Sequence, residues 1–341
     1  MSLKVLIVAT MYPTERSPGT GTFVEQIANR LSVRGHHVDL CVPPAGRAQG
    51  EVVGVRLHLW VGLKAVWMTW RRKPDVIYGH FLGPGTILPA LVNRRTPIVI
   101  TCHGEDVRNL GTWRLPGFSA RIVAARASFI VVSRFLLEEL RGHVPSVSAA
   151  TPVISCGVDL KLFPLLPAPD GPTAYLCIGT LSERKNVFAL AQAFDQMRGP
   201  GETLTFVGSG PDATVNKLRS YEGVVVEEAI VHEKLPALLA RAHVVCQPSI
   251  REPFGLGALE GLAAGRAVVG TENGGHQEFI PRGSGIGVLV NPHNIDDIAQ
   301  KLREAASYRC PNPEAREAAR LHDLDLQVTR IEEVLAGLVP G

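Results

Sequence analysis

Residues 242–261 read AHVVCQPSIREPFGLGALEG, and this stretch indicates how the chain folds. Its first seven residues form a mostly apolar run that ends at Pro248, as a buried strand does. From Leu256 onward, apolar residues recur at the spacing of one helix face. A strand followed at once by a helix is the repeating unit of a parallel α/β sheet. The stretch therefore predicts a strand, a tight turn and a helix in an α/β domain.

Two glutamates flank the start of this predicted helix. Glu252 lies in the turn, and Glu260 lies about two turns into the helix. Between them, the backbone N–H groups near Phe254, Gly255 and Leu256 should attract a phosphate, because a helix start carries partial positive charge. The two carboxylates can accept hydrogen bonds from hydroxyls on either side of that phosphate. The arrangement suits a sugar, a diphosphate and a ribose in a row, although two such glutamates also occur by chance in helical proteins.

The same alternation of strand and helix patterns runs along the chain and is interrupted once. Residues 164–172 contain four prolines, which excludes a helix or a central strand and predicts a domain linker. We therefore expect two α/β domains, residues 1–164 and 173–321, and a tail, residues 322–341, whose amphipathic helix packs back on the first domain. The expected strands are 5–9, 37–42, 75–78, 98–101, 128–132, 152–155, 174–178, 203–207, 224–226, 244–247 and 267–270, and the expected helices include 23–33, 187–197, 295–306 and 327–338.

The composition excludes several classes of protein. A chain of 341 residues that is 45% apolar can form two domain cores of ordinary size. A net charge of +3 is too small to indicate nucleic acid as a partner. The six cysteines are widely spread without zinc-like spacing, so we expect free thiols in a reducing, cytoplasmic compartment. No apolar run approaches roughly 18 residues, and the run at 3–10 fits a first strand better than a signal peptide, so no membrane span is expected.

Other turns at predicted strand ends carry residues that can contact an anionic ligand. Gly21 and Thr22 open the first helix, where N–H groups can approach a phosphate, although an ordinary loop is an equal alternative. His103 follows a strand directly, beside a glycine, and the alternative is a structural histidine. Arg184 and Lys185 follow the first strand of the second domain and can neutralise a diphosphate, unless they form only a solvated basic turn.

Two further features do not indicate a cofactor. Asp323 and Asp325 resemble a metal-binding Asp-x-Asp pair, but they lie at the polar start of the terminal helix, away from any strand end. The glycine turn at 18–22 lacks the complete Gly-x-Gly-x-x-Gly pattern, so NAD is not expected.

Together these residues resemble the retaining glycosyltransferases of the GT-B fold, specifically glycosyltransferase family 4, over almost the whole chain. Glu252 and Glu260 match the family's Glu-x7-Glu motif. The resemblance implies an α/β fold of two Rossmann-like parallel-sheet domains facing across a cleft, the first for the acceptor and the second for the nucleotide-sugar donor. Further matching segments are MYP at 11–13, GTFV at 21–24, HGEDV at 103–107, CGVD with a later F at 156–163, VGSGP at 207–211, and GRAVVG with the later GG and E at 265–278.

The resemblance also implies a role for each site residue. Glu260 would bind the ribose hydroxyls, and Glu252 would hold hydroxyls of the donor sugar. Lys185, helped by Arg184, would neutralise the leaving diphosphate, while His103 would contact the donor sugar near its oxocarbenium-like centre. The anomeric configuration would be retained, with a donor that is usually UDP-linked and sometimes GDP-linked, as in GDP-mannose, and with no metal or other cofactor. The remaining donor-binding residues by resemblance are Gly21, Thr22, Gly208, Ile230, Phe254, Gly255 and Leu256.

Three positions depart from the family's pattern. Thr180 stands where an arginine is frequent, and Arg184 is the residue that can reach the same phosphate. Cys156 stands where an asparagine is frequent, and we interpret it as structural. His243 replaces a usual aspartate with no clear consequence.

The acceptor leaves the weakest signal. The segment from Leu57 to Lys73 contains three of the four tryptophans among basic residues, which suits an interfacial helix near anionic lipid. The alternative is a helix packed on the sheet with a solvated basic end. The first reading predicts a lipid-linked or cell-surface glycan acceptor and a peripheral contact with the inner face of the membrane, whereas the second leaves a small-molecule acceptor open.

Two rival functions belong to other classes. A GT-B sugar-nucleotide epimerase or phosphorylase is one, and the intact Glu-x7-Glu motif argues against it. A non-catalytic nucleotide-sugar-binding protein is the other, and Thr180 is the feature that favours it. The presence of His103, Lys185, Glu252 and Glu260 argues for the transferase.

Overall fold

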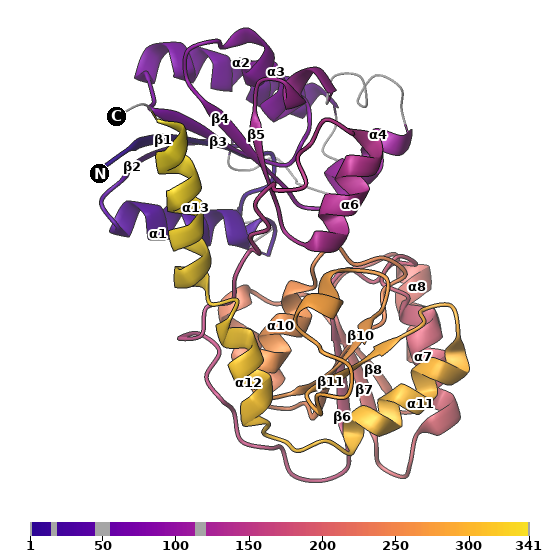
Figure 1. Ribbon diagram of the computed structural model, residues 1–341. Helices are drawn as coiled ribbons and strands as arrows, with labels where there is room; N and C mark the ends of the chain where they lie inside the picture. Colours follow the sequence, from indigo (N-terminus) through magenta and orange to yellow (C-terminus); the bar gives the residue numbers. More distant parts are fainter. Residues whose placement is uncertain (1, 15–18, 45–54, 113–120, 340–341) are drawn as a thin grey trace. The chain divides into compact units, whose positions relative to one another are not determined.

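The computed structural model describes residues 2–14, 19–44, 55–112 and 121–339. The chain divides into two compact units, one formed by Met1–Gly157 with Leu324–Gly341 and the other by Val158–Asp323. Each unit is an α/β domain with its own parallel sheet (Figure 1). The chain passes from one unit to the other after Gly157 and again after Asp323. The two crossing segments lie side by side, since the N–H of Val158 donates to the carbonyl oxygen of His322 at 2.9 Å.

The first unit is built from the strands β1 (Lys4–Val8), β2 (His37–Cys41), β3 (Val76–His80), β4 (Ile98–Cys102) and β5 (Ser128–Val131), and from the helices α1 (Thr22–Val33), α2 (Val55–Arg72), α3 (Pro84–Val92), α4 (Glu105–Thr112), α6 (Arg134–His143) and α13 (Leu324–Leu338). Its sheet has the order β2-β1-β3-β4-β5, and every pairing is parallel. The helices α1 and α13 lie together on one face of this sheet (Figure 1). From α13, the apolar residues Val328, Ile331 and Leu335 recur at helical spacing and are buried in the core with β1.

The second unit is built from the strands β6 (Ala174–Ile178), β7 (Thr203–Val207), β8 (Val224–Glu227), β9 (Val244–Gln247), β10 (Ala267–Thr271) and β11 (Gly287–Val290), from the helices α7 (Val187–Met197), α8 (Asp212–Arg219), α9 (Leu235–Leu239), α10 (Leu256–Ala263), α11 (Ile295–Ala306) and α12 (Pro313–Arg320), and from the short 3₁₀ turns η1 (His232–Lys234) and η2 (Gly275–Glu278). Its parallel sheet has the order β11-β10-β9-β6-β7-β8. Phe194 of α7, Phe206 of β7 and Leu302 of α11 are fully buried together, so α7 and α11 cover the same face.

The proline-rich segment 164–172 lies inside the second unit and is not the boundary between the units. Arg266 is fully buried, and its guanidinium donates to the carbonyl oxygens of Leu166 at 3.3 Å and Pro167 at 2.7 Å. These bonds hold the segment against the second unit, so the chain divides at Gly157, before the prolines. The C-terminal segment that belongs to the first unit begins at Leu324.

Several expected strands are shifted by one or two residues at their ends, and two differ from the expectation in whether they form at all. The expected strand 152–155 was wrong: it pairs with β5 only through a bridge between Val131 and Val153. Pro152 has no N–H with which to extend the ladder. The edge strand β11 was not expected, because only four residues form it and the glycine-containing turn 281–286 precedes it.

Candidate active site

The turn between β9 and α10 is held by two other loops of the same unit. The N–H of Glu252 donates to the carbonyl oxygen of Asn273 at 3.1 Å, and the carbonyl oxygen of Glu252 accepts from the N–H of Gly275 at 2.9 Å. The N–H of Ile250 donates to the carbonyl oxygen of Arg184 at 2.9 Å. The loops after β6, β9 and β10 therefore meet, because the carboxyl ends of parallel strands share one edge of the sheet.

The carboxylate of Glu252 is buried and carries a buried ion pair. Its Oε2 accepts from Nζ of Lys185 at 2.6 Å and from Oγ of Ser249 at 3.0 Å. Burial is the largest single influence and would raise the pKa of Glu252, but the charge and hydrogen bond of Lys185 and the nearby His276 and Arg184 together hold that pKa at about 2. The charge of Arg184 acts in the same direction, so both basic residues of the β6–α7 loop influence this carboxylate.

Gly255 begins α10 in a conformation that few other residues can adopt. Its φ is 99°, and a Cβ there would lie 2.1 Å from Nε2 of His276. His276 is fully buried, and its Nδ1 accepts from the N–H of Thr271 at 2.9 Å. Nε2 is therefore the protonated nitrogen, and it faces Oε1 of Gln247 at 3.4 Å. The histidine ring lies under the start of α10 and leaves no room for a side chain at position 255.

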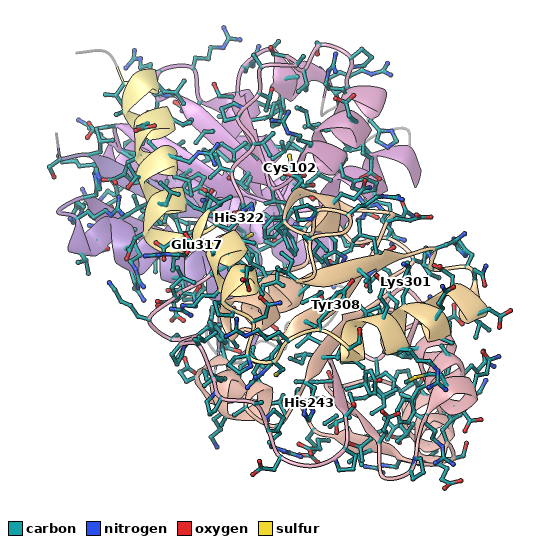
Figure 2. All side chains as sticks on the ribbon, turned by 60° about the horizontal axis from the view of Figure 1, so that its bottom comes forward. Cys102, His243, Lys301, Tyr308, Glu317 and His322 are labelled. Atoms are coloured by element: carbon teal, nitrogen blue, oxygen red, sulfur yellow. The ribbon has the colours of Figure 1, made fainter. Side chains whose placement is uncertain are left out.

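Phe254 is buried in an aromatic cluster. Its ring centroid lies 5.3 Å from that of Phe279 and 5.6 Å from that of His322, which is labelled in Figure 2. Only 4% of Phe254 is exposed, so its side chain is not available to a ligand and only its backbone can bind one. The ring anchors the turn from within.

Glu260 lies two turns into α10 and is also buried. Its Oε1 lies 2.7 Å from Nε2 of His232 in η1, and the ring of Phe163 packs edge-on against His232 at 5.4 Å. Burial lowers the pKa of His232. The hydrogen bond to Glu260 and the nearby acidic charges together raise that pKa by more than burial lowers it, so the pKa lies above its ordinary value. His232 therefore restrains the Glu260 carboxylate, whose own pKa burial raises above its usual value.

Gly208 and Ile230 follow β7 and β8 at the same edge of the sheet. A Cβ at position 208 would lie 1.8 Å from the carbonyl oxygen of Gly179, so the loops after β6 and β7 touch through their backbones. The N–H of Leu181 donates to the carbonyl oxygen of Ser209 at 2.8 Å and joins the same two loops. Gly208 is thus required for the close approach of the two loops.

In the first unit, His103 follows β4 and makes two contacts through its ring nitrogens. Nε2 lies 3.1 Å from Nδ1 of His80, and Nδ1 lies 3.7 Å from Sγ of Cys156. The rings of Phe23 and Phe81 each lie 4.6 Å from the histidine ring. Burial, and then the neighbouring His80, hold the pKa of His103 well below its usual range, so the ring is neutral near pH 7.

Gly21 and Thr22 begin α1 in the same unit. Gly21 precedes the helix with φ 71°, and a Cβ there would lie 2.7 Å from the carbonyl oxygen of Met11. Thr22 is the first helical residue. The glycine is therefore required for the entry of the chain into α1.

The structure brings most of the predicted donor residues together in the second unit. Lys185 and Glu252 form the ion pair, and the loops that carry Arg184, Gly208 and Gly255 converge at one edge of the sheet. His103, Gly21 and Thr22 lie in the first unit. Sequence reasoning missed the partners of these residues, which are Ser249, His232, His276, Gln247 and His80.

Two other features are absent from the part of the chain that the structure describes: a metal site and a membrane-spanning helix. In residues 2–14, 19–44, 55–112 and 121–339, no group of three or more His, Cys, Asp or Glu side chains has the geometry of a metal site. Asp325, one of the two aspartates that resemble a metal-binding pair in the sequence, accepts a hydrogen bond from the guanidinium of Arg30 at 3.0 Å. Within the same ranges, no helix is both long and apolar enough to cross a membrane.

Comparison with known proteins places the chain in a family. A family model described as Glycosyltransferase Family 4 matches residues 18–162, and one described as Glycosyl transferases group 1 matches residues 172–307. The chain belongs to glycosyltransferase family 4. This family 4 glycosyltransferase transfers a sugar, and its two Rossmann-like parallel-sheet domains form the GT-B fold.

Individual relatives agree with this assignment. A glycogen synthase of Mycobacterium tuberculosis is 28% identical over an alignment of 356 residues, which covers 88% of this glycosyltransferase and 85% of the relative. The sucrose-phosphate synthase of Thermosynechococcus elongatus has a similar fold, with a TM-score of 0.79, 21% identity, and coverage of 98% and 99% of the two chains. Anabaena HepE, solved in complex with UDP and glucose, gives a TM-score of 0.71, 19% identity, and coverage of 98% and 100%.

Proposed function

We propose that this chain is a retaining glycosyltransferase that moves a sugar from a nucleoside diphosphate sugar to a hydroxyl of its acceptor. A UDP-sugar is the first candidate donor and GDP-mannose the second, and the acceptor is a glycan, a lipid-linked sugar or a small molecule. The observation that carries the proposal is the pair of buried carboxylates, Glu252 and Glu260, on either side of the α10 start, each with its own cationic or proton-sharing partner. A diphosphate fits between two groups that hold hydroxyls.

In this proposal the second unit binds the donor. Glu260, restrained by His232, accepts hydrogen bonds from the ribose hydroxyls, and Glu252 accepts them from the sugar. Lys185 neutralises the diphosphate as it leaves and its charge grows. Because Lys185 is already 2.6 Å from Glu252, the cation is held in place before the donor binds and needs little reorganisation. Arg184 supplies the charge that Thr180 lacks, and its effect on the pKa of Glu252 supports that role.

For His103 we propose contact with the donor sugar. A neutral imidazole can donate through one ring nitrogen and accept through the other without adding a positive charge, and a hydrogen bond to the sugar would replace its contact with His80 or the longer one with Cys156. The backbone N–H groups near Gly255 and Leu256, together with Lys185, would then replace a metal ion at the diphosphate. The reaction would thus be metal-independent, with the departing phosphate accepting the proton of the acceptor.

The test is thermal unfolding of the full chain with millimolar UDP, GDP, ADP, TDP or NAD. A nucleotide at a hundred times its dissociation constant should add about 2.7 kcal/mol to the stability of the protein. We expect the wild type to be stabilised by one of the nucleoside diphosphates, the one that forms part of its nucleotide-sugar donor. Glu260→Gln should lose most of that stabilisation, whereas the exposed control Glu317→Gln should keep it. His103→Ala should keep it too but lower turnover.

Other outcomes would contradict the proposal. Stabilisation by none of the nucleotides, or by NAD alone, would exclude a nucleotide-sugar donor site. Nucleotide binding without transfer to any acceptor, combined with turnover of the nucleotide sugar itself, would favour the epimerase. Inversion of the anomeric centre in the product, read by NMR, would contradict retention.

A further inference from the structure

The helix α2 of the first unit exposes its apolar residues. Trp60, Leu63, Trp67 and Trp70 recur at intervals of three or four residues along one side, and Leu59 lies one turn before Leu63; we call these five side chains the α2 outer face. Their exposed fractions run from 37% for Trp60 to 75% for Trp70. A surface helix normally places polar residues on the side away from the core. An apolar stripe that includes three tryptophans indicates a surface that another body covers.

The opposite side of α2 already supplies the contacts that hold the helix in place. Val61, Ala65 and Met68 are buried. A Cβ on Gly62 would lie 2.9 Å from the carbonyl oxygen of Pro84 in α3, so the two helices approach closely there. The α2 outer face therefore contributes little to the packing of this unit.

The charged side chains of α2 itself, and of Lys73 that follows it, are of one sign. Arg56, Arg71, Arg72 and Lys73 are exposed, and the chain has no acidic residue from 55 to 73. Nζ of Lys64 lies 4.9 Å from the ring centroid of Trp60, which keeps a fifth cation beside the apolar stripe. The surface is thus both apolar and cationic, and its complement is both apolar and anionic.

We propose that the α2 outer face binds peripherally to an anionic lipid bilayer, with the helix lying in the plane of the membrane surface. Tryptophan has an apolar ring and a polar N–H, which suits the boundary between headgroups and acyl chains. Arginine and lysine side chains beside it reach the anionic headgroups. A second copy of the chain fits less well, because a symmetric contact through α2 would bring the same cations together without an acidic partner on the helix.

Co-sedimentation with vesicles tests the proposal without any nucleotide sugar, so its result does not depend on the transferase reaction. The full chain should bind vesicles of phosphatidylcholine and phosphatidylglycerol, and should bind pure phosphatidylcholine much more weakly. Trp67→Ser with Trp70→Ser should lower the partition coefficient at least about tenfold, because two exposed rings no longer enter the interface. Arg71→Gln with Arg72→Gln should lower it roughly 25-fold at low salt, and less at high salt.

Matched controls carry the same chemical changes elsewhere on the surface. Val33→Ser with Leu321→Ser removes two exposed apolar side chains outside α2, and Arg282→Gln with Arg309→Gln removes two exposed charges. Both controls should bind vesicles as the wild type does. Thermal unfolding should be nearly unchanged in all four variants, because the replaced side chains are exposed.

Three results would overturn the proposal. The first is the absence of binding to the anionic vesicles. The second is binding that neither the tryptophan nor the arginine variant weakens more than its control. The third is self-association, seen by sedimentation equilibrium, that Trp67→Ser with Trp70→Ser abolishes, since the α2 outer face would then be an interface between two copies.

Discussion

Lys185 compensates a carboxylate that would otherwise be buried alone. Its Nζ lies 2.6 Å from Oε2 of Glu252, and the two side chains are only 15% and 9% exposed. We predict that Lys185→Met lowers the free energy of unfolding at neutral pH by about 3–5 kcal/mol, because it leaves an unpaired buried charge. The matched control is Lys301→Met on α11, whose partner is also 2.6 Å away but whose pair is more exposed. The control should change stability by less than about 1 kcal/mol in urea unfolding.

The pH dependence of this difference has a definite sign. The pKa of Glu252 is about 2 in the folded protein and 4.5 ordinarily, so its contribution is fully present above pH 4.5 and is lost as the pH falls toward 2. In Lys185→Met, the cation that offsets the effect of burial is gone, so the pKa of Glu252 rises. The carboxyl then accepts a proton at a higher pH than in the wild type. The gap between variant and wild type should therefore shrink between neutral pH and about pH 4. A gap independent of pH would assign the loss to packing alone.

At the scale of single residues, motif residues were predicted from sequence but their partners were not. The turn chemistry around Glu252 and Glu260 is local, so Pro253, Gly255 and the helical spacing after them reveal it. His232 reaches Glu260 from 28 positions earlier. No local pattern records such a contact, because it depends on which loops the sheet order brings to one edge.

The element that shapes the donor site is the junction of β9 and α10. Gly255→Ala should destabilise the protein by about 2–5 kcal/mol, because alanine is strained in a left-handed backbone conformation and its Cβ would also collide with the buried ring of His276. It should weaken nucleotide binding as well, since the N–H groups at the start of α10 must move. Urea unfolding and calorimetric titration with the stabilising nucleotide measure the two effects.

Gly283→Ala separates backbone strain from collision. Gly283 has φ 72°, and a Cβ there would meet no atom within 4 Å. Its loss should be only about 1–2 kcal/mol, with nucleotide binding unchanged. Equal losses in the two variants would show that His276 moves aside freely and does not brace the turn.

Elements with strong periodicity were predicted from sequence, and weak ones were not. The strands 174–178, 203–207 and 244–247 and the helices 187–197 and 295–306 have the bounds that the structure gives them, because each is a clear apolar run or an amphipathic stripe. The segment 152–155 is apolar enough for a strand but contains Pro152, and its partner edge is used for a single bridge. Propensity cannot decide whether such an edge pairs.

At the scale of the whole molecule, the chain builds two separate cores, and its last helix completes the first of them. Ile331 of α13 is buried with β1 and α1, while Leu302 of α11 is buried with α7 and β7. Contacts within each unit are therefore made by segments far apart in sequence, since α13 returns to the first unit after the second is complete. Residue patterning predicts an amphipathic tail, but the face that it covers follows only from the fold.

We predict two unfolding transitions in calorimetry, each sensitive to a different core. Ile331→Ala should lower the transition of the first unit, and Leu302→Ala that of the second, because each truncation leaves a cavity that costs about 2–5 kcal/mol. The nucleotide that stabilises the wild type should raise only the transition that Leu302→Ala lowers, since a ligand stabilises the unit that binds it. If both variants lowered one shared transition, the two cores would unfold as a single cooperative system, and the donor unit would not be energetically separate from the rest of the chain.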